Sequence, residues 1–96
     1  MTYKILRHKD FTDEWNDLPV AIREQLKKKL AKVIINPHIP KNRLHGDLAN
    51  CYKIKLLKAG VRLVYQVDDD KVIILLVTVG KRAENAVYVE AGKRLL

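Results

Sequence analysis

The chain has 96 residues, of which 48% are apolar, enough for a single domain spanning residues 1–96 with one hydrophobic core. Its one cysteine, Cys51, excludes an intramolecular disulfide and a cysteine-based zinc site, and its longest nearly apolar run, residues 72–79, is far shorter than the ~20 residues of a membrane span. The net charge of +8 favours a polyanionic partner, and with no targeting segment in view we expect a cytoplasmic protein.

The first two predicted elements are a short strand and a short helix. Residues 2–7 alternate loosely between polar and apolar side chains, which predicts a strand. Asp10 is a favourable helix N-cap with Asp13 in the capping-box position, and apolar residues then recur at helical spacing from Phe11 to Leu18. We therefore expect a short helix to begin after Asp10.

A longer second helix is predicted from Pro19, a residue type that suits the first turn of a helix, to about residue 36. Its apolar stripe consists of Ile22, Leu26, Leu30, Val33 and Ile34. Lys28 and Lys32 fall on the opposite face, where they are candidate RNA contacts. A solvated helix face is the simpler explanation of these two lysines.

The remainder of the chain predicts a loop, three strands and a final helix. Prolines, asparagines and a glycine make residues 36–50 a loop, and the strands follow at residues 51–57, 61–67 and 72–79. The last strand is apolar almost throughout, as in a central strand covered on both faces. From Glu84 the pattern is helical again, but Gly92 and β-branched residues weaken this helix, which we expect to be marginal and mobile.

The order β-α-α-β-β-β-α predicts an α+β fold. Two N-terminal helices pack on a mainly antiparallel four-stranded sheet, and a short C-terminal helix completes the domain.

Positive charge is concentrated in the middle of the chain. Residues 25–67 contain ten basic residues and one acid, a net charge of +9, whereas the acids cluster at residues 10–17 and 68–70. This asymmetry favours a face that binds nucleic acid. A solvated surface that is merely basic is the alternative.

Strand alternation gathers some of this charge on one face. Residues at positions 51, 53, 55 and 57 share a face, so Lys53 and Lys55 point the same way. A two-residue turn at Ala59 and Gly60 would pair Leu57 with Arg62 and place Arg62 beside them. Three cations brought together cost Coulomb energy, which an anionic partner would offset. Chance alternation on a solvated sheet face remains the alternative.

Further candidates lie at the ends of this hairpin and of the last strand. Lys58 stands in the hairpin turn, and Lys81 and Arg82 follow the last strand. The aspartate turn leaves the register of that strand open by one residue, so either Lys81 or Arg82 lies on the same face as Lys53. Tyr88 lies on an early turn of the final helix and either stacks on a base or packs on the sheet.

Other chemistry is weakly supported. His8, His38 and His45 lie in predicted loops or near the first turn, so none is placed as an acid or base on the basic hairpin. Cys51 has cationic neighbours but no histidine positioned as its base, and we interpret it as structural. No metal or cofactor motif is present.

Four blocks resemble the RelE toxins of bacterial toxin–antitoxin pairs. They are REQLKKKL (residues 23–30), CYKIKL (51–56), VRLVYQV (61–67) and VGKR (79–82). The resemblance extends from residue 3 to residue 96 and implies an endoribonuclease, an mRNA interferase that cuts message in the A site of the small ribosomal subunit and inhibits translation.

Carried over by position, the resemblance implies an active face of Lys53, Lys55, Arg62, Arg82 and Tyr88, with neither metal nor cofactor. The further candidate RNA contacts are Lys28, Lys32, Lys58 and Lys81. The resemblance favours Arg82 over Lys81 on that face. The implied reaction is attack of the 2′-hydroxyl on the adjacent phosphorus, which leaves a 2′,3′-cyclic phosphate and a 5′-hydroxyl. Lys55 or Lys53 would remove the proton, Arg62 would stabilise charge on the phosphate, Arg82 would bind it, and Tyr88 would stack on a base or orient the hydroxyl.

The resemblance also implies partners: mRNA, ribosomal RNA, a RelB-like antitoxin, and operator DNA only through the antitoxin complex, with no membrane. Two rival functions stay open. One is a gyrase poison of the related ParE kind, and the other is a non-catalytic RNA-binding module.

Overall fold

The computed structural model describes residues 2–81 and 84–95. Its elements are β1 (Lys4–Arg7), α1 (Phe11–Asn16), α2 (Val20–Val33), β2 (Cys51–Leu56), β3 (Val61–Asp68), β4 (Ile73–Gly80) and α3 (Glu84–Leu95). The connection from α2 to β2 contains two short 3₁₀ turns, Pro40–Asn42 and Gly46–Leu48. This order confirms the predicted α+β fold.

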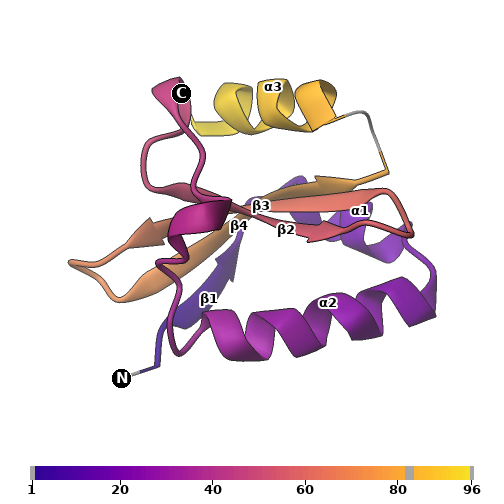
Figure 1. Ribbon diagram of the computed structural model, residues 1–96, viewed down its shortest axis with the longest axis horizontal. Coiled ribbons are helices and arrows are strands. Elements are labelled where there is room, and N and C mark those ends of the chain that lie inside the picture. The colour runs from indigo at the N-terminus through magenta and orange to yellow at the C-terminus, as the bar shows by residue number, and fades with distance from the viewer. Residues whose placement is uncertain (1, 82–83, 96) are drawn as a thin grey trace.

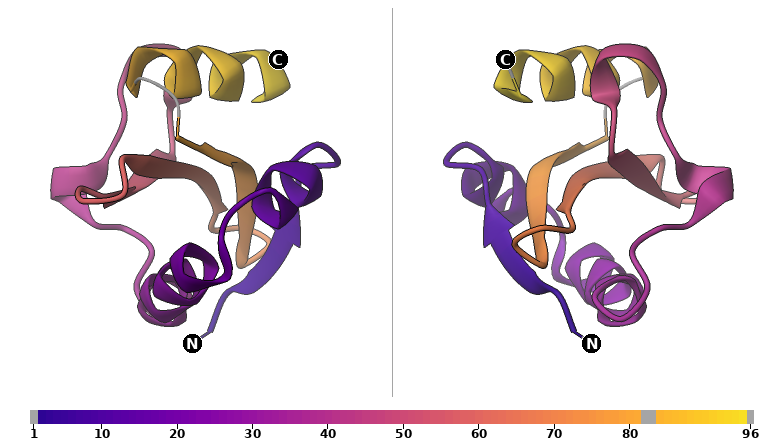
Figure 2. Two further views of the ribbon diagram at one scale, coloured as in Figure 1. Left: turned by 90° about the vertical axis from the view of Figure 1, so that its right-hand side faces the viewer. Right: turned by 90° about the vertical axis from the view of Figure 1, so that its left-hand side faces the viewer.

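The sheet has the order β1-β4-β3-β2, with β1 parallel to β4 and the other neighbours antiparallel. The apolar β4 is therefore a central strand, as expected. Helix α2 covers one face of the sheet and α3 covers the other, while α1 lies beside the edge formed by β1 and β4 (Figures 1 and 2). No helix in the described part of the chain is long and apolar enough to cross a membrane.

Each side of the sheet has its own core. The larger core, under α1 and α2, includes Phe11 and Leu18 and the predicted stripe residues Leu26, Leu30 and Val33, which are all buried. The smaller core, under α3, consists of Leu44, Leu48, Cys51, Val64, Val77, Val87 and Ala91. Strands β3 and β4 thus bury apolar side chains on both faces.

One predicted local interaction is absent. Asp10 does precede α1, but its backbone is helical, with φ −90° and ψ −8°, and its side chain makes no capping hydrogen bond. A capping side chain needs an extended backbone to reach back to the first amides of the helix. The backbone N–H of Asp10 instead donates to Nδ1 of His8, at 3.2 Å.

The β2–β3 hairpin has a longer turn than predicted. Leu56 pairs with Val61 and Lys55 with Arg62, so residues 57–60 form the turn and the expected pairing of Leu57 with Arg62 is wrong. The difference is two residues, which preserves the faces because side chains alternate with period two. Gly60 has φ +67° in this turn, a conformation that glycine adopts without strain.

A β-bulge in β4 determines on which face of the sheet the side chains at the end of that strand lie. Val64 pairs with Thr78 and Tyr65 with Leu76, which leaves Val77 as the extra residue. Beyond the bulge, Arg62 pairs with Gly80. The side chain of Lys81 therefore belongs to the face opposite Arg62, by strand alternation.

The end of the β3–β4 turn is strained. Val72 has φ +56°, a left-handed conformation that is costly for a β-branched side chain. Asparagine tolerates this conformation, so Val72→Asn is expected to raise the free energy of unfolding by about 1 kcal/mol. Urea denaturation would measure the gain. Lys71→Asn, in the same turn, should change stability by less than about 0.5 kcal/mol, and an equal gain there would show that strain at Val72 is not the cause.

Candidate nucleic-acid interface

Three cations converge on the α3 side of the β2–β3 hairpin, and we call Lys53, Lys55 and Arg62 the cationic face. Lys55 is directly opposite Arg62, which places their Cβ atoms about 4.5–5.5 Å apart. Lys53 is two residues away on the same face and so lies diagonally from Arg62, at about 7–8 Å. The predicted convergence of these three side chains is confirmed.

Arg62 is held in an unusual environment. It is half-buried, and its Nε is buried without a hydrogen-bond partner among the described residues. Its paired residue on β4 is Gly80, which has no side chain to lie directly beside it. A buried donor without a partner costs about 1–3 kcal/mol, and an anionic ligand that accepts its hydrogen bond would offset that cost. The geometry therefore suits a phosphate.

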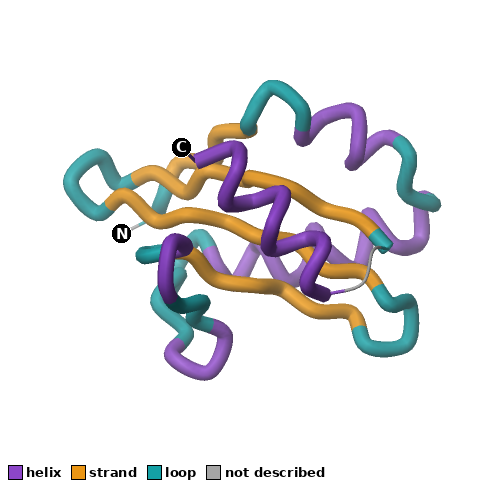
Figure 3. Tube along the Cα trace, turned by 90° about the horizontal axis from the view of Figure 1, so that it is seen from above, coloured by secondary structure: helices purple, strands orange, loops and turns teal. Residues whose placement is uncertain are grey.

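Helix α3 lies across the same side of the sheet (Figure 3). Its residues Val87 and Ala91 are fully buried against the sheet, and Tyr88 is half-buried and packs on the same small core. Tyr88 therefore lies on the side of the sheet that carries the cationic face. Arg82, the fifth predicted active-site residue, is outside the described residues.

The C-terminal half of α3 is anchored by Arg94, which the sequence did not single out. Its guanidinium contacts both carboxylate oxygens of Glu14, at 2.6 and 3.1 Å, and Oε2 of Glu90, at 3.0 Å. Burial alone would lower the pKa of Arg94, but the hydrogen bonds and charges of the two glutamates outweigh it and raise the pKa. The only sequence signal was the spacing of Glu90 and Arg94, four residues apart on a helix.

The predicted RNA contacts are dispersed. Lys32 lines a hollow of about 480 Å³ at the edge of β2 that Lys29, Lys41 and Lys55 also line, so it extends positive charge from the cationic face. Lys28 is exposed on the outer side of α2, and Lys58 is exposed in the hairpin turn. Lys81 instead lines a hollow with Glu14 and Asp17, on the α1 side.

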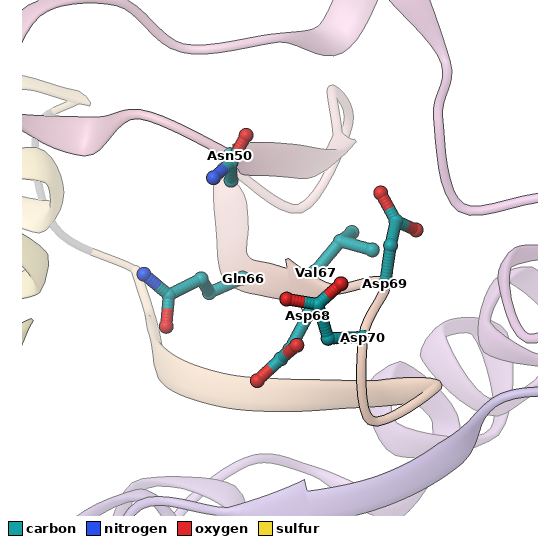
Figure 4. A pocket seen from close by; sticks show the side chains of 6 residues that line it. All are labelled: Asn50, Gln66, Val67, Asp68, Asp69 and Asp70. Atoms are coloured by element: carbon teal, nitrogen blue, oxygen red, sulfur yellow. The ribbon is translucent and has the colours of Figure 1, made fainter.

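The far end of β3 has the opposite charge. A hollow of about 350 Å³ is lined by Asn50, Gln66, Val67, Asp68, Asp69 and Asp70, and Asp69 points away from the other two aspartates (Figure 4). Strand β3 thus runs from the cationic face to an acidic turn, roughly 23 Å away at 3.3 Å per residue. The separation keeps these carboxylates from neutralising the cationic face.

Asp69 joins the N-terminus, the loop and the sheet through hydrogen bonds. Its Oδ1 accepts from the Tyr3 hydroxyl at 2.6 Å and contacts Nε2 of His38 at 2.8 Å, while Nδ1 of His38 contacts the Tyr52 hydroxyl at 2.7 Å. His38 therefore serves a structural network on the core side of β2. The hydrogen bond from Tyr3, followed by that with His38, lowers the pKa of Asp69.

This network predicts a contribution to acid stability. The pKa of Asp69 is lower in the folded than in the unfolded chain. Ionised Asp69 therefore stabilises the fold above the ordinary carboxyl pKa of about 3.9, and this stabilisation is lost as the pH falls through the pKa of the folded chain. Asp69→Asn should lower the melting temperature at pH 7 and leave little difference from the unsubstituted chain at pH 2.5. Asp70→Asn is the control, and an equal loss there at pH 7 would contradict the assignment.

Cys51 is fully buried under α3, and burial raises its pKa to about 11. The thiol is therefore protonated at neutral pH and takes no part in the cationic face. The structural interpretation of Cys51 is confirmed.

The chain is similar to known toxins in both sequence and fold. The family model described as "ParE toxin of type II toxin-antitoxin system, parDE" matches residues 5–86. The chain is 53% identical over 83 residues to the mRNA interferase toxin RelE of Escherichia coli, covering 86% of each protein. Its fold matches a mutant of E. coli toxin RelE in the free state with a TM-score of 0.90, at 47% identity and with 100% of both chains covered.

The fold of the chain also matches RelE in the intact E. coli RelBE toxin–antitoxin complex. The TM-score is 0.81 at 45% identity, with 85% of this chain and 99% of that chain covered. The matched region includes β2, β3 and β4, which carry the cationic face. The chain therefore belongs to the RelE toxins, within the RelE/ParE superfamily of type II toxin–antitoxin systems.

Proposed function

We propose that this chain is the toxin of a type II toxin–antitoxin system, a cytoplasmic endoribonuclease that cuts mRNA in the ribosomal A site and is neutralised by a RelB-like antitoxin. The observation that carries the proposal is the convergence of Lys53, Lys55 and Arg62 on one rigid hairpin, in a chain 53% identical to an mRNA interferase. Ribosomal RNA provides the docking surface for the remaining basic residues, and operator DNA is reached only through the antitoxin.

The proposed reaction is metal-independent attack by the 2′-hydroxyl on the adjacent phosphorus. Lys55, directly opposite Arg62, removes the hydroxyl proton, and Lys53 supports it from the diagonal position. Arg62 donates to the phosphate oxygens, where negative charge grows in the transition state. The P–O5′ bond then breaks and the leaving O5′ takes a proton from water, which gives a 2′,3′-cyclic phosphate and a 5′-hydroxyl.

The rest of the proposed active face lies on or before α3. Tyr88 stacks on a base or orients the 2′-hydroxyl, and Arg82 binds the phosphate. This assignment of Arg82 rests on its position in the VGKR block, because the residue lies outside the described part of the chain.

The residue types of this face explain why the ribosome would be needed. Arginine has an ordinary pKa above about 12, so it is a poor proton donor to the leaving oxygen at neutral pH. Holding the reacting groups in line is worth about 7–11 kcal/mol, which can offset weak acid–base catalysis. The ribosome supplies that positioning by fixing the codon against the cationic face.

The alternative function is a gyrase poison of the ParE kind, because the matching family model is described as a ParE toxin. Gyrase binding does not require Lys53, Lys55 and Arg62 to converge, and the curated relative at 53% identity is an mRNA interferase. RNA cleavage is therefore the better supported function. A non-catalytic RNA-binding module would bind RNA with strong salt dependence and leave it intact.

Primer extension on a defined message bound to ribosomes tests the proposal. Breaks confined to the A-site codon are expected, with none in free RNA and few with Arg82→Ala. A folded preparation that leaves the message intact would overturn the nuclease assignment. A parallel assay of gyrase-dependent DNA breaks identifies the ParE-like activity, and salt-dependent binding without breaks identifies the binding module.

A further inference from the structure

The contact between Glu14 and Arg94 joins two elements that are far apart in sequence. Glu14 is on α1, beside the edge of the sheet formed by β1 and β4, and Arg94 is in the last turn of α3, which covers one face of the sheet. Their side chains are only 15% and 9% exposed, and their closest atoms, Oε1 and Nη1, are 2.6 Å apart. A bidentate and largely buried pair of this kind is more directional than an exposed ion pair.

The same two side chains bind the bulge in β4. Nη1 of Arg94 donates to the carbonyl oxygen of Val77, the extra residue of the bulge, at 2.8 Å. The carboxylate of Glu14 accepts from the hydroxyl of Thr78, at 2.9 Å, and from the backbone N–H of Val79, at 3.4 Å. Strand β1 pairs with β4 only as far as Leu76, so Glu14 satisfies the edge of β4 beyond that point.

These contacts bear on two parts of the proposed active face. The bulge sets the register that places Gly80 beside Arg62. Arg94 holds the helix that carries Tyr88, and the same helix also packs on the sheet through the apolar side chains of Val87 and Ala91. Apolar packing is non-directional, whereas the bidentate contact with Glu14 restrains how α3 can slide and rotate on the sheet.

We infer that Glu14 and Arg94 are positioning residues for cleavage, which fix α3 and thereby hold Tyr88 over the cationic face. This inference rests on the proposed nuclease function. Neither residue contacts RNA, and both act through the placement of Tyr88. Misplacing a reacting group by about 1 Å can cost on the order of 100-fold in rate.

The test measures kcat and KM for cleavage of ribosome-bound message, at a temperature where circular dichroism shows each variant to be folded. Arg94→Gln and Glu14→Gln should each lower kcat roughly 10- to 100-fold with KM unchanged, and Arg94→Lys should be intermediate. In a Tyr88→Ala background, Arg94→Gln should lower kcat by less than about twofold, because the misplaced group is already absent.

Glu90→Gln is the matched control. It also removes a carboxylate from Arg94, but one that lies on α3 itself and does not tie the helix to the sheet. It should keep kcat within about twofold of the unsubstituted chain. An equal loss with Glu90→Gln, or a full further loss in the Tyr88→Ala background, would overturn the inference.

A second measurement separates this inference from the proposed function. Hydrogen exchange should show reduced protection of α3 amides relative to β3 amides in Arg94→Gln, and the ring signals of Tyr88 should shift in NMR spectra. Unchanged protection and unchanged ring signals would overturn the positioning role even if the chain cleaves RNA. A chain that never cuts ribosome-bound message would instead refute the nuclease assignment.

Discussion

Arg62→Gln is expected to lower the rate of cleavage of ribosome-bound mRNA by about 100- to 1,000-fold. Loss of one donor to a developing oxyanion typically costs this much. Arg62 is half-buried, its Nε has no hydrogen-bond partner among the described residues, and its paired residue on β4 is a glycine, so it is placed to donate to a phosphate. Primer extension with quantified product over time measures the rate.

The same substitution should not lower the stability of the fold. Arg62→Gln relieves repulsion from Lys55 and removes an unsatisfied buried donor, so the free energy of unfolding should be unchanged or slightly higher. Lys71→Gln is the matched control, since it removes the same charge at an exposed site in the β3–β4 turn. Its cleavage rate should equal that of the unsubstituted chain. Equal rates for both variants would contradict a role for Arg62 in the reaction.

The largest expected effect on stability is that of Leu63→Ala, which should lower the free energy of unfolding by about 2–5 kcal/mol. Leu63 is fully buried on β3 and pairs with Ile54 on β2 and Val79 on β4. Its removal leaves a cavity in the core between the sheet and α2. Because domains of this size are stable by only about 5–15 kcal/mol, urea denaturation should show a large shift in midpoint.

Leu57→Ala provides the comparison, because Leu57 is the same residue type in the adjoining turn and is 79% exposed. It should change the free energy of unfolding by no more than about 0.5 kcal/mol. If the two substitutions cost the same, β3 is not the centre of the core.

Local sequence patterns were enough to predict the helices, the strands and the faces of the sheet. Period-two alternation placed Lys53, Lys55 and Arg62 on one face, and the helical stripe identified Leu26 and Leu30 as core residues. These features depend on local periodicity, which any consistent fold must respect. The same logic explains why the face of Arg62 was predicted correctly although its pairing partner was not, because the register error was an even number of residues.

Features that depend on contacts between distant segments could not be predicted from local patterns. The bulge at Val77 reverses the alternation of β4, and it is held by Arg94 and Glu14, which no spacing rule connects across 80 positions. Asp10 lacks its predicted cap because its backbone is helical, and its N–H donates to Nδ1 of His8. His38 finds Asp69 and Tyr52 only once the loop folds back on the sheet. Propensity describes the chain within a few residues, whereas these contacts depend on how the layers pack, and packing is a property of the whole fold.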